Sequence, residues 1–286
     1  MVPTGLWLLE IAAPFRLQLA LVGAVLMIAL LAVKRRHAGG ICLLCSLVLS
    51  SHLIPYYSDM PQPDSDRLQL SLLSWNTWRD VNSGAEMRMA LQKFQPQLAF
   101  FQEVTLEEEA GFLAEGYVKN YVGDFLVLMK PEVVVVVEPH FPEWTDTPSV
   151  FMTIRFEGQF VDIYSLHPRS PMSVRRLRHR NQFFKQLESK INASVHASIV
   201  IGDLNTTPTD PAFKSLLTSA NLRNSMIGFG WQTSWPYDNI ILSALRIPID
   251  HCLSSATLKV VDRKLGDAHP SNHKPLFVRV QSVEQN

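Results

Sequence analysis

The N-terminal part of the chain is dominated by two uncharged apolar runs. The first spans residues 17–33 and reads LQLALVGAVLMIALLAV, and the second spans residues 38–57. The sequence KRRH at 34–37 separates them. A helix needs about 20 apolar residues to cross a bilayer, and the first run reaches this length if it is extended across Arg16, whose charge can reach the membrane surface. Residues 1–57 are therefore predicted to be a membrane anchor of two transmembrane helices that form a hairpin.

The basic loop between the runs predicts an orientation. Loops rich in Lys and Arg stay on the cytoplasmic side, so the 34–36 loop is predicted to be cytoplasmic. Everything after Tyr57 is then extracytoplasmic, in the periplasm of a cell with two membranes, and the opposite orientation is the alternative. A cleaved signal peptide is a second interpretation of the first run, but another apolar run directly after the basic loop favours the hairpin. The predicted location is the cell membrane, with the lipid bilayer as a partner.

The rest of the chain has the composition of a globular α/β domain. Residues 58–67 (SDMPQPDSDR) are polar and contain prolines, which predicts a short linker before a domain at 68–286. Of the 26 basic and 26 acidic residues, four basic residues and one acid lie in residues 1–55, so the remainder carries a net charge of −3. This charge argues against broad electrostatic capture of DNA. Three cysteines exclude a disulfide-dense scaffold.

The start of this domain alternates between strand and helix patterns. Residues 68–75 and 98–101 are predicted strands, and apolar residues at helical spacing over 87–94 predict a helix between them. A strand, a crossover helix and a second strand imply parallel pairing. Asn76 and Glu103 then emerge from the same edge of one sheet, where ligand sites of α/β proteins form.

Polar side chains recur at the ends of the later predicted strands. Taken singly, each is better explained as an ordinary turn residue, so only the ordered set indicates a site. In this set, His167 follows a predicted hairpin of 150–156 and 160–166. Asp203 and Asn205 follow a predicted helix over 174–191 and a predicted strand at 198–201. Asp250 begins a predicted strand, and Asn272 and His273 precede one at 275–280.

The segments that carry these residues resemble the endonuclease/exonuclease/phosphatase family, and most of all its bacterial membrane-anchored members. The resemblance covers roughly residues 68–280. It implies a four-layer α/β sandwich of the deoxyribonuclease I-like fold, with two central sheets flanked by helices and one divalent-metal site at the sheet edges. The matching segments are SLLSWNTW, QLAFFQEV, YSLHPRSP, IVIGDLNTTP, RIPIDHCLS and SNHKPLFVRV.

The chemistry of phosphoester hydrolysis fits these residue types. It requires a cation to neutralise the phosphoryl oxygens, a base for water and donors for the developing charge. Glu103 is a hard oxygen ligand suited to Mg²⁺ or Mn²⁺. The resemblance implies that Asn76 contributes to the metal site with Glu103 and that Asp203 positions or deprotonates water. It also implies that Asn205 holds a phosphate oxygen and that His167 donates to the phosphoryl group. Asp250 would hold His273 against the scissile phosphate.

One position departs from the family pattern. The family usually has Ser-Asp-His where this chain has Ser-Asn-His at 271–273. Asn272 keeps the shape of the side chain but loses a negative charge, so metal affinity should fall. Asn272 and Arg169 are assigned here to substrate binding. A run of arginines from Arg169 to Arg180 suggests a phosphate-binding rim, although a solvated helix face is the favoured interpretation.

The sequence therefore predicts a membrane-anchored, metal-dependent phosphoesterase. Its substrate would be a nucleic acid, a nucleotide or a phospholipid head group, and no obligate protein partner is evident. The first alternative is a catalytically impaired protein that binds phosphates on the same fold. The second is that the apolar N-terminal region is the functional part and anchors a partner complex.

Overall fold

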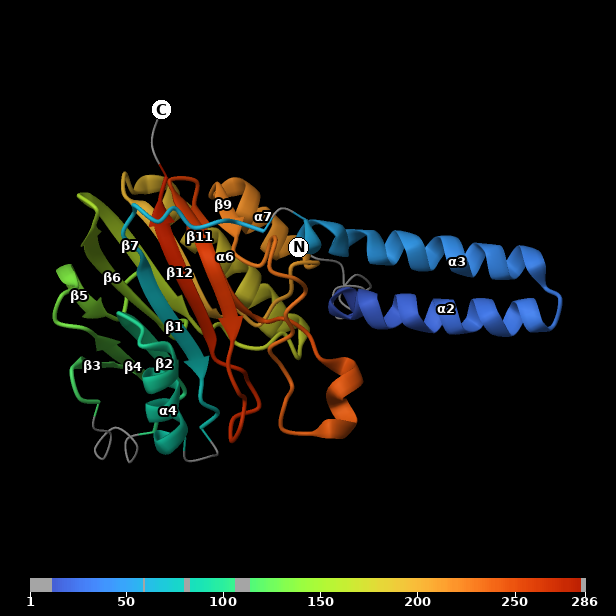
Figure 1. The fold of residues 1–286 in the computed structure, drawn as a ribbon, viewed down its shortest axis with the longest axis horizontal. Helices are drawn as coiled ribbons and strands as arrows, with labels where there is room; N and C mark the ends of the chain where they lie inside the picture. Colours follow the sequence, from blue (N-terminus) through green and yellow to red (C-terminus); the bar gives the residue numbers. More distant parts are fainter. Residues whose placement is uncertain (1–11, 59, 80–82, 106–113, 284–286) are drawn as a thin grey trace.

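Two six-stranded sheets and a projecting pair of helices make up the molecule (Figure 1). The computed structural model describes residues 12–58, 60–79, 83–105 and 114–283. The first 11 residues of the predicted anchor and the last three of the predicted domain lie outside the described residues.

The apolar N-terminal runs form two antiparallel helices that project away from the sheets (Figure 1). They are α2 (Arg16–Ala32), which follows the short helix η1 (Ala13–Phe15), and α3 (Arg36–Ser50), which continues into η2 (Ser51–Tyr57). Both helical stretches are long and apolar enough to cross a membrane. Only 6% and 11% of their apolar windows are buried, so neither is the core helix of a globular domain. The hairpin shape agrees with the sequence prediction.

The first sheet has the strand order β11-β12-β1-β2-β4-β3. Strands β1 and β2 pair in parallel, as predicted, with Asn76 beside Gln102 at their ends, and the other neighbouring pairs are antiparallel. The strands are β1 (Leu70–Asn76), β2 (Leu98–Gln102), β3 (Val118–Val122), β4 (Phe125–Met129), β11 (Leu258–Leu265) and β12 (Leu276–Ser282).

The second sheet has the strand order β5-β6-β7-β8-β10-β9. Its only parallel pair among the described strands is β7 with β8, and the predicted hairpin is formed by β6 and β7. The strands are β5 (Val134–His140), β6 (Ser149–Phe156), β7 (Gln159–Leu166), β8 (Ala197–Asp203), β9 (Leu222–Asn224) and β10 (Asp250–Ser255).

The two sheets pack face to face and helices cover their outer faces. The central core joins apolar side chains of both sheets, such as Phe100 and Ile201. Helix α4 (Gly84–Phe94) covers the outer face of the first sheet. Helices α6 (Val174–Ala193) and α7 (Pro211–Ser219) cover that of the second. The four layers confirm the predicted α/β sandwich.

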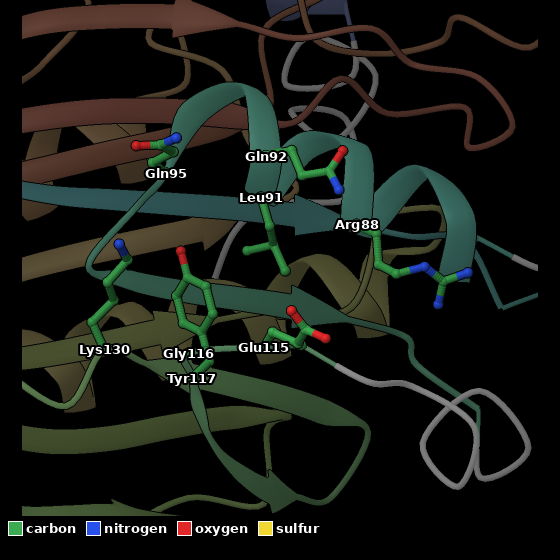
Figure 2. A pocket seen from close by; sticks show the side chains of 9 residues that line it. Arg88, Leu91, Gln92, Gln95, Glu115, Gly116, Tyr117 and Lys130 are labelled. Carbon is green, nitrogen blue, oxygen red and sulfur yellow. The ribbon is translucent and has the colours of Figure 1, made fainter.

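A surface hollow of about 700 Å³ lies beside α4. Figure 2 shows Arg88, Leu91 and Gln92 on one side of it and Tyr117 and Lys130 on the other. None of the polar residues singled out from the sequence lines this hollow.

Candidate active site

Strand register brings the predicted polar residues to one edge of the sandwich. Asn76 pairs with Gln102 in the first sheet, so Glu103 follows at the same level. In the second sheet Asp250 pairs with Asp203. The buried side chain of Gln102 joins the two sheets here, because its Oε1 accepts from the backbone N–H of Asp203 at 3.3 Å and its Nε2 donates to Ser74. Gln102 was not among the predicted site residues, and its sequence signal is an amide at the end of the apolar strand LAFFQ.

Asp203 lies at the centre of the cluster and is almost fully buried. Its Oδ1 accepts from the backbone N–H of Asn205 at 2.9 Å, and its Oδ2 accepts from Nδ2 of Asn76 at 3.2 Å. Nε2 of His167 lies 3.6 Å from the same Oδ2, and Nε2 of His273 lies 3.7 Å from it. Burial is the largest influence on Asp203 and raises its pKa, and the positive charge of His273 only partly opposes it. This carboxylate is therefore a better proton acceptor than an exposed aspartate.

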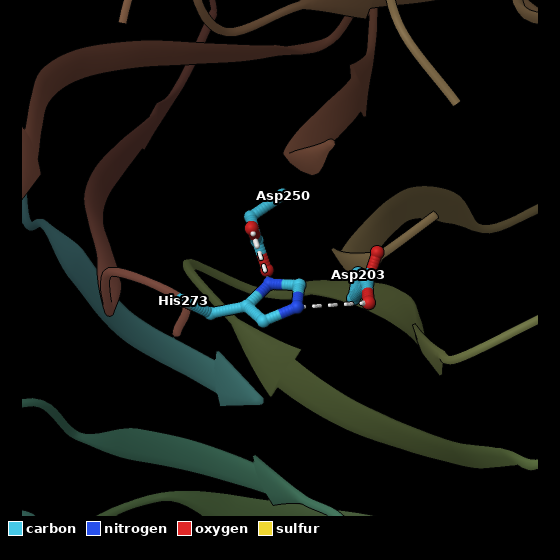
Figure 3. Close-up of side chains that lie close together, drawn as sticks. All are labelled: Asp203, Asp250 and His273. Carbon is cyan, nitrogen blue, oxygen red and sulfur yellow. Dashed lines mark hydrogen bonds and ion pairs between the residues drawn. The ribbon is translucent and has the colours of Figure 1, made fainter. Parts of the chain in front are cut away.

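Asp250 and His273 form a buried carboxylate–imidazole pair (Figure 3). Nδ1 of His273 lies 3.0 Å from Oδ2 of Asp250. Burial alone would lower the pKa of His273, but the charges of Asp250 and Asp203 outweigh it and raise the pKa to about 9. Ser271, the first residue of the Ser-Asn-His motif, had no predicted role; it positions the loop because its hydroxyl donates to the carbonyl of Asn76 and accepts from the backbone N–H of His273. Nε2 of the resulting imidazolium is a proton donor that faces Asp203.

Glu103 and His167, which are half-buried, lie with the buried Asn76 on the other side of the cluster. Nδ2 of Asn76 lies 3.0 Å from Oε1 of Glu103, and Nε2 of His167 lies 3.3 Å from that same oxygen. Burial by itself would raise the pKa of Glu103, but His167 and hydrogen bonds from Asn76 and from the backbone N–H of Arg79 together lower it. Oδ1 of Asn76 accepts from the backbone N–H of Trp78, so the predicted role of Asn76 as a metal ligand would require the opposite amide orientation.

The segment after Asp203 is fixed by a buried arginine. Arg180 pairs with Asp210 at 2.6 Å, and its Nη1 donates to the backbone carbonyl of Asn205 at 2.8 Å. Asn205, with φ of +47°, donates from Nδ2 to the carbonyl of Pro168 and to Asp203. The interpretation of the arginine run as a solvated face is wrong for Arg180, which is buried. Arg180 holds the backbone that positions Asp203.

The two predicted substrate-binding residues lie at the margin of this cluster. Arg169 is exposed, two residues after His167. Asn272 is half-buried, and its backbone carbonyl accepts from the N–H of Tyr237. Its Oδ1 is buried and has no hydrogen-bond partner within the described ranges. Asn272 thus offers an unused acceptor beside His273.

The charges of the cluster suit a divalent cation. Three carboxylates, those of Glu103, Asp203 and Asp250, converge with two imidazoles, those of His167 and His273, so acidic groups outnumber basic ones. Ligand atoms of Asp203, Asp250 and His273 lie within 4.8 Å of one another. However, His273 and Asp250 are already hydrogen-bonded to each other. Carboxylate oxygens are the ligands that Mg²⁺ and Mn²⁺ prefer, and Glu103 is the most exposed of the three carboxylates, with 23% of its side chain accessible against 2% or less for Asp203 and Asp250.

The pairing of His273 with Asp250 makes a prediction for titration. In metal-free protein, Asp250→Asn should lower the pKa of His273 from about 9, because the substitution removes the charge that most stabilises the imidazolium. NMR titration of the histidine ring protons measures this. The control is Asp146→Asn, which removes an exposed partner of His179 and should leave His273 unchanged. An unchanged His273 pKa in Asp250→Asn would contradict the proposed pairing.

A two-sheet sandwich with acids and histidines at one edge is the architecture of the deoxyribonuclease I-like phosphoester hydrolases. Over residues 73–273 the chain matches the sequence profile of the Endonuclease/Exonuclease/phosphatase family. The chain belongs to this family, and this membership supports a hydrolase that acts on phosphoester bonds. No curated protein matches the chain.

Solved structures share the fold at low sequence identity. TDP2 of D. rerio, in complex with a single-strand DNA product, is 17% identical, with a TM-score of 0.61 over 76% of this chain and 99% of that one. A mannosyl-6-phosphatase of Bacteroides thetaiotaomicron is 14% identical, with a TM-score of 0.57 over 74% and 99%. The catalytic domain of human Nocturnin with bound sulfate is 16% identical, with a TM-score of 0.55 over 76% and 96%. These likenesses establish the fold of residues around the site, not a substrate.

Proposed function

We propose that this protein is a membrane-anchored phosphoesterase that depends on Mg²⁺ or Mn²⁺ and uses water as the nucleophile. The observation that carries the proposal is the convergence of Glu103, Asp203 and Asp250 with His167 and His273 at one edge of the sandwich. The substrate is a phosphodiester or phosphomonoester of a nucleic acid, a nucleotide or a phospholipid head group. The neighbours, one with a bound single-strand DNA product and one a mannosyl-6-phosphatase, support the hydrolysis of phosphoesters.

Glu103 would hold the cation, and Asp203 shares two contacts with Glu103, Nδ2 of Asn76 and Nε2 of His167. When bound, the cation supplies positive charge for the phosphoryl oxygens. Asn76 keeps Glu103 in place through the 3.0 Å contact from its Nδ2. The low pKa of Glu103 keeps it ionised and ready to bind a cation at neutral pH.

Asp203 is the proposed base. It takes a proton from water while the water oxygen forms a bond to phosphorus and the ester P–O bond breaks; the electron pair of that bond stays on the leaving oxygen, which takes up a proton from solvent and departs as the alcohol. The backbone N–H of Asn205 fixes the position of Oδ1 of Asp203. Oδ2 then faces Nε2 of His167 and of His273. The raised pKa of Asp203 favours proton transfer to it.

The histidines are the proposed donors to the phosphate. Asp250 holds His273 as an imidazolium, so its Nε2–H can donate to a phosphoryl oxygen as negative charge develops. His167 presents Nε2 to the same space. Since all the implied catalytic side chains converge, the site does not favour a protein that only binds phosphate, and Asn272 alone supports that alternative.

The hairpin of α2 and α3 is the proposed anchor. Its apolar side chains are exposed along most of both helices, which in water would be a large aggregation-prone surface. We assign residues 1–57 to the anchor, 58–67 to the linker and 68–286 to the catalytic domain, with the domain on the extracytoplasmic side. The linker runs along the sandwich, where the backbone N–H of Asp64 donates to Gln281.

The metal proposal is tested by titrating Mn²⁺ into the full chain in detergent and measuring free Mn²⁺ by electron paramagnetic resonance. We expect one bound ion, and Glu103→Gln should weaken its binding by at least about 10-fold because a charged ligand becomes neutral. The matched control is Glu138→Gln on β5, an exposed carboxylate on a distant strand. Equal Mn²⁺ binding by Glu103→Gln and the unchanged protein would contradict the assignment.

A further inference from the structure

A short turn beside the site exposes large apolar side chains. The 3₁₀ helix η3 (Ile240–Leu245) begins at Asn239, whose side chain accepts from the backbone N–H of Ile241. Ile240 is 84% exposed and Ile241 is 83% exposed. Two adjacent isoleucines at the tip of a formed turn are a costly surface in water unless a partner covers them.

At the root of this turn, where the chain enters and leaves it, an aromatic side chain contacts two basic ones. The ring of Tyr237 lies between the guanidinium of Arg246, 3.9 Å from its centre, and the ammonium of Lys274, 4.1 Å from it. An apolar tip above tyrosine and cationic side chains is the pattern of segments that lie at a membrane surface, with the aromatic and basic groups at head-group level. The backbone N–H of Tyr237 also donates to Asn272, so the root is joined to the loop that carries His273.

The anchor hairpin leaves the domain next to this turn. Nε2 of Gln18, in the first turn of α2, donates to the carbonyl of Arg246 at 3.2 Å. The other end of the hairpin is also attached, because the carbonyl of Tyr56 accepts from the backbone N–H of Gly230. Figure 1 shows η3, in orange, at the end of the domain from which the hairpin projects. A bilayer that holds the hairpin would therefore begin near the level of η3.

We infer that the η3 turn inserts into the interfacial layer of the same bilayer that the hairpin spans, which rests on the proposed anchoring. Ile240 and Ile241 enter the acyl boundary, and Arg246 and Lys274 lie among the lipid phosphates. The domain is then held at two places, the hairpin and the turn. Through Tyr237 and Asn272 the second contact keeps the loop of His273 at the membrane surface.

The test uses the full chain in phosphatidylcholine vesicles that contain a minority of phosphatidylglycerol. Cys42 and Cys45 are replaced by alanine, and Cys252 is buried and unreactive to label. An environment-sensitive fluorophore is attached to Ile241→Cys, to Val195→Cys as the control, and to Val25→Cys in the middle of α2. Val195 is 98% exposed and precedes β8, at the opposite end of that strand from Asp203.

We expect lipids with a spin label high on the acyl chain to remove most of the emission of the fluorophore at 241 and to leave that at 195 unchanged. Iodide in the buffer should do the reverse. Quenching of the 241 label by iodide to the same extent as the 195 label would overturn the inference. So would protection of the 241 label from both quenchers, which would indicate a second protein copy on the turn.

The label at Val25, tested with a spin label deep on the acyl chain because the middle of α2 would lie near the centre of the bilayer, separates this inference from the anchoring on which it rests. Lipid quenching at 25 without lipid quenching at 241 overturns only the insertion of the turn. Absence of lipid quenching at both positions overturns the anchoring proposal and the insertion together. Lipid quenching at both supports the two-point attachment.

Discussion

Asp203→Asn is expected to lower the rate of phosphoester hydrolysis by about 10²–10⁴-fold, the usual contribution of a general base. The substitution keeps the shape of the side chain but removes the site that accepts the proton of water. The oxygen of the new amide can still accept from the backbone N–H of Asn205, so the chain should fold and melt cooperatively. Steady-state hydrolysis rates at saturating Mn²⁺, with circular dichroism of the same samples, measure both effects.

Asp162→Asn is the matched control for this prediction. Asp162 is a buried aspartate of the same sheet that accepts from Thr153, Ser194 and His196. It lies on β7 beside Ser198, near the start of β8, whereas Asp203 ends that strand. Asp162→Asn should reduce stability without changing the rate of the folded fraction. A rate loss in Asp162→Asn as large as that in Asp203→Asn would contradict the role of Asp203.

Gly202→Ala is expected to give the largest loss of stability. Gly202 has φ of +142°, and a Cβ there would lie 2.1 Å from the carbonyl oxygen of Leu166 and 2.9 Å from its nitrogen. Both atoms belong to the backbone of β7, which pairs with β8 in the middle of the sheet. The strands must separate to admit the methyl group, at a cost of about 3 kcal/mol, the upper end of the usual range for overpacking. Chemical denaturation of the full chain in detergent measures the change in unfolding free energy.

Gly123→Ala separates the steric clash from backbone strain. Gly123 also has a positive φ, +64°, but no atom lies within 4 Å of its added Cβ. Its cost should be about 1–2 kcal/mol, the penalty for an L-residue in this region. Equal destabilisation by Gly123→Ala and Gly202→Ala would show that the close approach of β7 to β8 does not account for the requirement for glycine at position 202.

The elements that carry the site were predictable from local patterns. The β6–β7 hairpin follows from two apolar strands around Glu157 and Gly158, and parallel pairing of β1 with β2 follows from the helix between them. Residues 104–149 received no assignment from the sequence, yet they contain β3, β4 and β5. These strands are short, and β3 and β5 are edge strands with mostly exposed side chains. Such strands lack the alternating pattern on which sequence reasoning depends.

The burial of Arg180 could be predicted from the helix pattern, but the partner of its charge could not. It is spaced with Leu177, Phe184 and Leu187 on the apolar face of α6, which signals burial. A buried arginine needs an anion, and Asp210 lies thirty residues away in the sequence. Only the packing of α6 against the start of α7 brings the two together. The contact from Arg180 to the carbonyl of Asn205 is tertiary for the same reason.

The most direct measurement is hydrolysis by the purified full chain, in detergent, of one substrate each from nucleic acids, nucleotides, sugar phosphates and phospholipids. Each reaction is run with Mg²⁺, with Mn²⁺ and with a chelator. The predicted result is metal-dependent release of product from at least one class, lost in both Glu103→Gln and Asp203→Asn. Absence of hydrolysis in every class with saturating metal, or equal rates with the chelator, would contradict a metal-dependent phosphoesterase.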